Sequence, residues 1–242
     1  MAHAQESARD VTANQNAEPQ TDRLEELLIA AAQCFQARGY AATSIDAVAR
    51  HMGATKGRVY HYFPSKMDLF NAVRERGMQI VFEATEAGYC ANLAAADRLT
   101  LMALGHVGAM MRHRAFMQVH REGLQMHRFG NATPEQHDAM ARHIRQRDAY
   151  ERRFRDVLRL GADNGVLRVG EPFAITIQSF MSALHSPVTW YSERADDTPE
   201  KLEQLAREVV RFAMLGLGVD LAARRWPEIP PLTDALTDEG TP

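Results

Sequence analysis

The chain has 242 residues, of which 45% are hydrophobic and 24% charged, and its formal net charge at pH 7 is −3. This composition is that of a globular protein of one or two domains, and the near-neutral charge gives no global sign of nucleic-acid binding. Two cysteines build neither a disulfide framework nor a structural zinc site, and no apolar run approaches the roughly 20 residues that span a bilayer. We therefore predict a cytoplasmic protein without a membrane partner, a metal or another cofactor, whose residues 1–20 form a disordered tail.

The apolar residues recur at helical spacing from Thr21 to about Leu221, and no period-2 strand pattern interrupts them. We therefore predict an all-α fold. Pro187 is expected to kink one helix by freeing the carbonyl of Ala183. The predicted helices cover residues 22–38, 45–52, 55–63, a longer stretch that starts after Pro64, and then 97–112, 115–129, 134–162, 172–192 and 199–221.

Capping residues set the boundaries of the first three helices. Asp22, Ser44 and Thr55 are placed to cap their N-termini, and Gly39 and Gly53 follow the ends of the first and second. Three short helices with a glycine turn between the second and the third form a compact unit.

Charge is distributed unevenly along the chain. Between Arg38 and Arg74 six basic residues accompany two acidic ones, a local net charge of +4, whereas beyond Ala195 ten acidic residues accompany five basic ones, a net −5. One basic end suits attraction to phosphates, because an exposed charge acts within about 10 Å at physiological salt. A solvated surface patch would give the same count.

The glycine turn lies inside a longer motif, TSIDAVARHMGATKGRVYHYFPSK, over residues 43–66. From Asp22 to Phe70 the chain resembles the N-terminal signature of TetR-type transcriptional repressors, with Thr55 where many relatives carry serine. The resemblance implies a homodimer that binds double-stranded operator DNA. It also implies a helix-turn-helix DNA-binding domain over 21–68, a helical effector-binding and dimerisation domain over 69–225, and a tail over 226–242.

The second helix of a helix-turn-helix lies in the major groove, where its first residues meet base edges. Lys56 and Arg58 occupy this position after Thr55, and Gly57 allows the backbone to approach DNA closely. A core aromatic is the alternative for Tyr60. The resemblance implies further contacts with phosphate or base from Thr43, Ser44, Tyr60, His61 and Lys66.

The last two predicted helices are the candidates for dimerisation, because one helix-turn-helix covers only half of a palindromic site. Their apolar faces could form a four-helix bundle between two chains, as in the family, or simply the core of one chain. The predicted interface residues are Leu184, Leu205, Val209, Phe212, Ala213 and Gly216.

Methionines are concentrated between Met102 and Met126, where five fall within 25 residues. Methionine adapts to variable apolar ligands, although core filling is its commoner use. Neighbouring arginines suit a ligand with an anionic head or, equally, a solvated face. The candidate pocket residues for a small apolar effector are Met102, His106, Met110, Met117, Arg121, Phe154, Phe180 and Met181.

A second resemblance concerns the effector. Residues 180–184 (FMSAL), then 190–192 (WYS) and an acidic Thr-Pro helix start, are similar to the C-terminal domains of regulators of fatty-acid and steroid breakdown. Those regulators answer to acyl-CoA thioesters, which implies such an effector here. Other hydrophobic or aromatic compounds are the alternative.

An enzyme is not expected, because the chain has no glycine-rich phosphate loop, no G-x-S-x-G and no H-E-x-x-H. His106, His113, His120 and His127 recur every seven residues, so two on one helix stand about 10 Å apart and cannot share a metal ion. We predict a repressor that an effector releases from a palindromic operator. The competing hypothesis is a helical adaptor that uses its helix-turn-helix for protein contacts without specific DNA binding.

Overall fold

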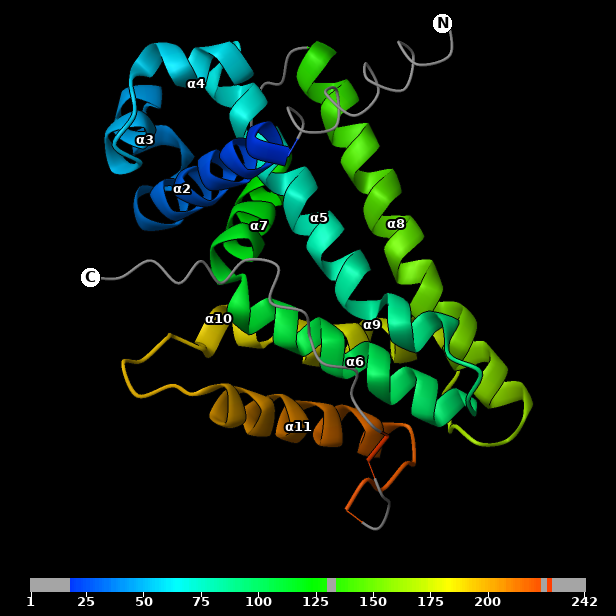
Figure 1. Ribbon diagram of the computed structural model, residues 1–242. Helices are drawn as coiled ribbons and strands as arrows, with labels where there is room; N and C mark the ends of the chain where they lie inside the picture. Colours follow the sequence, from blue (N-terminus) through cyan, green and yellow to red (C-terminus); the bar gives the residue numbers. More distant parts are fainter. Residues whose placement is uncertain (1–17, 130–133, 223–225, 228–242) are drawn as a thin grey trace, which may run out of the picture. The chain divides into compact units, whose positions relative to one another are not determined.

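The computed structural model describes residues 18–129, 134–222 and 226–227, except for the side chains of 18–21 and 125–137. Most of the predicted tails, at 1–17 and 228–242, lie outside these residues. No strand occurs in the described parts of the chain, which confirms the all-α prediction. The helices are α2 (Glu18–Ala42), α3 (Ile45–His51), α4 (Lys56–Tyr62), α5 (Lys66–Cys90), α6 (Ala95–Arg112), α7 (Arg114–Phe129), α8 (Pro134–Asp163), α9 (Phe173–His185), α10 (Pro187–Trp190) and α11 (Pro199–Gly216) (Figure 1).

The chain divides into two compact units. The N-terminal unit comprises the residues up to Gly77 together with Ala115–Ala139, and the C-terminal unit comprises Met78–Arg114 together with the residues from Met140 onward. Helices α5 and α8 therefore contribute residues to both units.

Helices α2, α3 and α4 pack in sequence within the N-terminal unit. Their apolar faces meet at Val48 and Val59, both fully buried. An aromatic cluster extends this core, because the ring of Phe70 lies 5.1 Å from that of Phe35 and 4.8 Å from that of Tyr40. Gly39, with a φ of 74°, breaks the helical path of α2, as its position in the sequence predicts.

Helix α6 is the central helix of the C-terminal unit, where it packs against α9, α10 and α11 (Figure 1). Its residues from Leu99 to Met111 are buried on all sides, as expected for a helix surrounded by others. Two glycines bring it against α5: Gly88 would place a Cβ 2.6 Å from the Met102 backbone nitrogen, and a Cβ on Gly105 would overlap the carbonyl oxygen of Ala84.

Three boundary predictions are wrong. Helix α2 begins at Glu18, so Asp22 lies inside it and does not cap it. Pro187 ends one helix and begins another, and the carbonyl of Ala183 accepts a hydrogen bond from the Ser186 N–H at 3.3 Å. Helix α11 ends at Gly216, because Gly218 adopts a φ of 78° and the following chain folds back onto the last turn.

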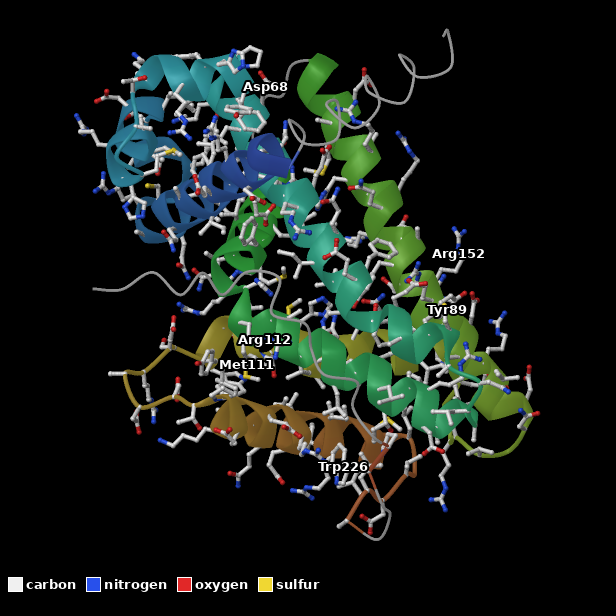
Figure 2. The ribbon with its side chains drawn as sticks, in the orientation of Figure 1. Asp68, Tyr89, Met111, Arg112, Arg152 and Trp226 are labelled. Carbon is white, nitrogen blue, oxygen red and sulfur yellow. The ribbon has the colours of Figure 1, made fainter. Side chains whose placement is uncertain are left out.

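The chain after α11 returns to the surface of that helix. The Arg207 guanidinium lies 4.9 Å from the centre of the Trp226 ring, beside α11 in Figure 2. Trp226 is half-buried. The predicted C-terminal tail therefore begins with a residue that is packed on the helical body.

Candidate nucleic-acid interface

Helices α3 and α4 are joined by a four-residue connection that places them in a helix-turn-helix. Ser44 caps α3 by accepting a hydrogen bond from the Ala47 N–H at 3.1 Å, and Thr55 caps α4 through the Arg58 N–H at 3.4 Å. Gly53 supplies the positive φ of 65° that the turn requires. These local signals explain why both helices were predicted within one residue of their observed ends.

One face of α4 is anchored and the other is open. Val59 is fully buried, whereas Lys56, Gly57, Arg58, Tyr60 and His61 are exposed. Tyr60 keeps 44% of its surface accessible, so the alternative of a core aromatic is wrong. The Lys56 Nζ lies 5.6 Å from the centre of the Tyr60 ring, a cation–π contact that holds the charge over the outer face.

Lys66 faces inward in this structure. Its ammonium donates hydrogen bonds to the backbone carbonyls of Tyr40 at 2.8 Å, Ala41 at 3.3 Å and Thr43 at 2.8 Å. Nζ also lies 4.3 Å from the centre of the Tyr40 ring. These contacts use all three donors of an ammonium group, so the geometry supports a structural role more than a phosphate contact.

The side chain of Thr43 is likewise turned into the protein interior. Its side chain is 2% exposed, and its hydroxyl donates to the carbonyl oxygens of Gly39 at 2.8 Å and Cys34 at 3.1 Å. The predicted phosphate contact of this hydroxyl therefore has no support in the geometry. Thr43 and Lys66 together secure the chain that follows the break in α2.

The same segment receives a contact that sequence reasoning missed. The Tyr40 N–H donates to Glu122 Oε1 of α7 at 2.7 Å, and this carboxylate oxygen would lie 3.3 Å from a Cβ on Gly39. The two residues are 82 positions apart, and no periodicity or motif links them. Helix α7, assigned from the sequence to the effector domain, thus packs within the N-terminal unit.

The basic charge of residues 38–74 is only partly available to a partner. Arg50 pairs with Asp46 at 2.6 Å. Arg74 is buried, and desolvation lowers the pKa of its guanidinium to about 10, so it stays charged at neutral pH. Lys56 and Arg58 at the start of α4 are exposed, as is Arg38 on α2, so these three cations are accessible to a phosphate partner.

The predicted pocket residues fall into three groups. Met102, His106, Met110, Phe154, Phe180 and Met181 are all buried in the C-terminal unit. Met117 is buried in the N-terminal unit, where its methyl group lies 3.7 Å from a Cβ on Gly77. Arg121 is exposed and lies in the N-terminal unit, apart from the buried residues of the C-terminal unit.

The dimer residues also divide by burial. Leu184 and Ala213 belong to the core of the single chain and cannot line an interface, because they are 0% and 7% exposed. Leu205 and Val209 are half-buried, and Gly216 is exposed. Phe212 is 72% exposed, the most accessible of the large apolar side chains in the described chain.

The described residues form neither a metal-binding cluster nor a membrane-spanning helix. They contain no group of three or more His, Cys, Asp or Glu side chains that could hold a metal ion. None of their helices is long and apolar enough to cross a membrane.

A helix-turn-helix with an open, basic second helix, joined to a larger helical body, defines a DNA-binding transcription regulator with a ligand-binding domain. Comparison with known families agrees. Residues 27–73 match the bacterial regulatory proteins of the tetR family, and residues 92–217 match the tetracyclin repressor-like C-terminal domain. The chain belongs to the TetR family of transcriptional regulators.

Two relatives of known sequence match over a short part of the chain. The transcriptional activator FasR of Mycolicibacterium smegmatis is 41% identical over 58 residues, 24% of this chain and 26% of that protein. The uncharacterised regulator YxaF of Bacillus subtilis is 41% identical over 44 residues, 18% of this chain and 23% of that protein. The matches thus span about a quarter of the length of these relatives.

Solved structures match over most of the chain. The TetR-family regulator PfmR of Thermus thermophilus is 25% identical, with a TM-score of 0.66 over 79% of this chain and 98% of that one. The ketosteroid transcriptional regulator of Mycobacterium tuberculosis is 21% identical, with a TM-score of 0.65 over 81% of this chain and 94% of that one. The second likeness concerns the fold alone.

Proposed function

We propose that this protein is a homodimeric repressor that a small apolar effector releases from a palindromic operator in the bacterial cytoplasm. The observation that carries the DNA-binding part is the open face of α4, where Lys56, Arg58 and Tyr60 are exposed around the buried Val59. Arginine at the start of a recognition helix suits base contact, because its guanidinium can bind guanine through two hydrogen bonds.

Fluorescence anisotropy with the protein's own upstream DNA tests this proposal. We expect Arg58→Ala to weaken operator binding by about 5- to 150-fold and to reduce the preference for operator over scrambled DNA. Arg142→Ala, which removes the same charge from an exposed position on α8, is the matched control and should leave the preference unchanged. Equal binding of operator and scrambled DNA by the wild-type protein would instead favour a helical adaptor.

The proposed dimer uses an unpartnered seam on α11. Leu202, Leu205, Val209, Phe212 and Gly216 follow one another at spacings of three and four residues, the pattern of a helix that packs lengthwise against another. None of them is fully buried in the single chain. The adjacent helix α9 presents Ile175, which is 61% exposed, and the small exposed residue Ser182. Two such faces, related by a twofold axis, would form a four-helix bundle.

Light scattering coupled to size exclusion tests the seam. We expect Phe212→Glu to shift the dimer to the monomer, because two carboxylates would be buried about the twofold axis. The matched control is Leu160→Glu, which places the same charge on another exposed apolar residue, 42% accessible on α8. A monomeric wild-type protein that still binds its operator specifically would rule out the dimer.

The effector proposal rests on the C-terminal unit. Its interior is apolar and rich in methionine and aromatic side chains, and exposed arginines such as Arg145 and Arg152 lie on α8. An acyl-CoA thioester fits both features, with its acyl chain inside and its phosphates near arginine; a hydrophobic or aromatic compound fits the interior alone. Release of labelled operator by a panel of acyl-CoAs, with free acids and uncharged aromatics beside them, distinguishes the two.

A further inference from the structure

The interior of the C-terminal unit contains a polar cluster that the proposed function leaves unexplained. His106 of α6 is fully buried, and its Nδ1 forms a 2.6 Å hydrogen bond with the hydroxyl of Tyr150 on α8. Its other nitrogen, Nε2, is buried and has no hydrogen-bond partner among the residues that the structure describes. Buried polar atoms of this kind are rare, because leaving one without a partner costs free energy.

A second such atom lies on the same helix as Tyr150. Gln146 precedes Tyr150 by four residues, one turn of α8, and its buried Oε1 is also without a partner in the described chain. The surrounding surface is aromatic: the ring of Tyr150 lies 5.1 Å from that of Phe82 and 5.5 Å from that of Phe154. Two buried polar atoms without a partner are thus associated with Tyr150, one in the imidazole ring that bonds its hydroxyl and one on a residue a single turn away along α8.

His185 connects this cluster to accessible space. Its ring lies 4.6 Å from that of His106, and its Nδ1 donates to the Met181 carbonyl at 2.6 Å. The side chain keeps accessible surface, yet desolvation is the main cause that lowers the pKa of its imidazole. The exposed His185 ring thus lies between the buried His106 ring and the surface of this unit.

The cluster offers no charge to an anionic ligand group. Burial lowers the pKa of His106 and raises that of Tyr150, so both are neutral at pH 7. The arginines nearby already have carboxylate partners: Arg153 pairs with Glu86, and Arg155 with Glu151 at 2.9 Å. A buried carboxylate would therefore lack a counter-ion, which is unfavourable.

We infer that the effector carries a neutral hydroxyl group on an apolar skeleton, and that His106 Nε2 and Gln146 Oε1 bind this hydroxyl. A hydroxyl both donates and accepts, so it can satisfy the amide oxygen and whichever tautomer the histidine adopts. This inference deepens the proposed effector role and rests on it. The hydroxyl could belong to a free alcohol or phenol, or to a hydroxylated acyl chain of a thioester.

Calorimetry on the full-length protein with matched pairs of compounds tests the inference. The pairs are 1-naphthol and naphthalene, 4-butylphenol and butylbenzene, and 3-hydroxydecanoyl-CoA and decanoyl-CoA. We expect at least one hydroxylated member to bind about tenfold or more tightly than its partner. An apolar site without polar partners gives the opposite order, because burying an unpaired hydroxyl is unfavourable. If no hydroxylated member binds better than its partner, the inference is overturned.

Variants then assign the preference to the cluster. We expect His106→Phe and Gln146→Leu each to remove most of the hydroxyl preference while the partner compound binds as before. Thr100→Val is the matched control, because it deletes a buried hydroxyl of α6 that already bonds the Ala96 carbonyl at 2.7 Å. Should His106→Phe fail to fold, Gln146→Leu and the wild-type pairs still decide the question. A preference that survives both substitutions would overturn the assignment.

Operator binding is measured in parallel, so that the two proposals fail separately. Specific DNA binding without any hydroxyl preference leaves the proposed regulator intact and overturns this inference. A hydroxyl preference without specific DNA binding overturns the proposed function itself.

Discussion

Lys66 shows how a residue inside a DNA-binding motif can serve the fold. The break at Gly39 directs the carbonyls of Tyr40, Ala41 and Thr43 toward one point, and the ammonium occupies that point. A cation beside the carbonyl end of a helix is also favoured by the helix dipole. The contact therefore fixes the end of α2 against the start of α5.

We predict that Lys66→Met lowers the free energy of unfolding by about 1–3 kcal/mol, because three carbonyls lose a charged donor. Below its melting transition the variant should bind DNA with an unchanged salt dependence, since no phosphate contact is removed. Urea unfolding and anisotropy titrations at several salt concentrations measure the two effects. Lys56→Met is the matched control and should show the reverse, with stability kept and the salt slope reduced by about one unit. A reduced salt slope for Lys66→Met would instead show that Lys66 contacts a phosphate, as the sequence predicted.

His106 gives the stability of the protein a pH dependence. Burial holds the pKa of its imidazole well below the usual value of 6.5, so the unfolded chain binds the proton more readily than the folded one. The stabilisation that the neutral His106 imidazole gives the folded state is therefore fully present above about pH 6.5. It is lost as the pH falls toward the pKa of His106 in the folded state. His185, whose pKa is also lowered by burial, acts in the same direction.

We predict that the free energy of unfolding falls between about pH 7 and pH 5, and that His106→Phe reduces this slope by up to about 1.4 kcal/mol per pH unit. Chemical denaturation at a series of pH values measures the slope. Thr100→Val, which removes no titrating group, should lower stability equally at each pH. A slope that His106→Phe leaves unchanged would show that His106 does not titrate differently in the folded state.

At the scale of elements, local chemistry predicted most helices, and contacts between distant segments decided the rest. Ser44, Gly53 and Thr55 act within three or four residues, so the helix-turn-helix followed from the sequence. The hydrogen bonds of Lys66 to the carbonyls after Gly39, and that of the Tyr40 N–H to Glu122, depend on where other helices lie, which periodicity does not encode. Periodicity was also insufficient for Leu184 and Ala213, because an apolar residue fits a core and an interface equally. Both were predicted at the dimer interface and are buried in the core of the single chain.

The close approach of α5 and α6 is an element-scale property of the same kind. We predict that Gly105→Ala destabilises the protein by about 3 kcal/mol, because its Cβ would overlap the Ala84 carbonyl oxygen and force two helix backbones apart. Gly57→Ala is the contrasting variant. Nothing lies within 4 Å of a Cβ at Gly57, so alanine should stabilise α4 by about 0.5–1 kcal/mol while weakening DNA binding. Thermal unfolding distinguishes the two, and a Gly105→Ala protein as stable as the wild type would show that α5 can shift without cost.

At the scale of the whole molecule, the near-neutral net charge is the sum of a basic segment and an acidic segment that lie in different parts of the chain. The basic excess lies between Arg38 and Arg74, in the N-terminal unit, and the acidic excess lies in the chain beyond Ala195. Attraction to phosphate decays over about 10 Å at physiological salt, so the local charge matters and the average does not. Two copies of the N-terminal unit in one dimer would double the number of phosphates that a single binding event neutralises.

The salt dependence of operator binding therefore reports on the whole assembly. The logarithm of the affinity falls with the logarithm of salt concentration with a slope of about −0.9 for each phosphate neutralised. We predict that Phe212→Glu, made monomeric through the α11 seam, binds its operator with about half the slope of the wild type, because each protein then occupies one half-site. Leu160→Glu adds the same negative charge without touching the seam and should keep the full slope. A monomeric Phe212→Glu protein with the wild-type slope would mean that a single chain makes every phosphate contact, and that the palindromic arrangement is wrong.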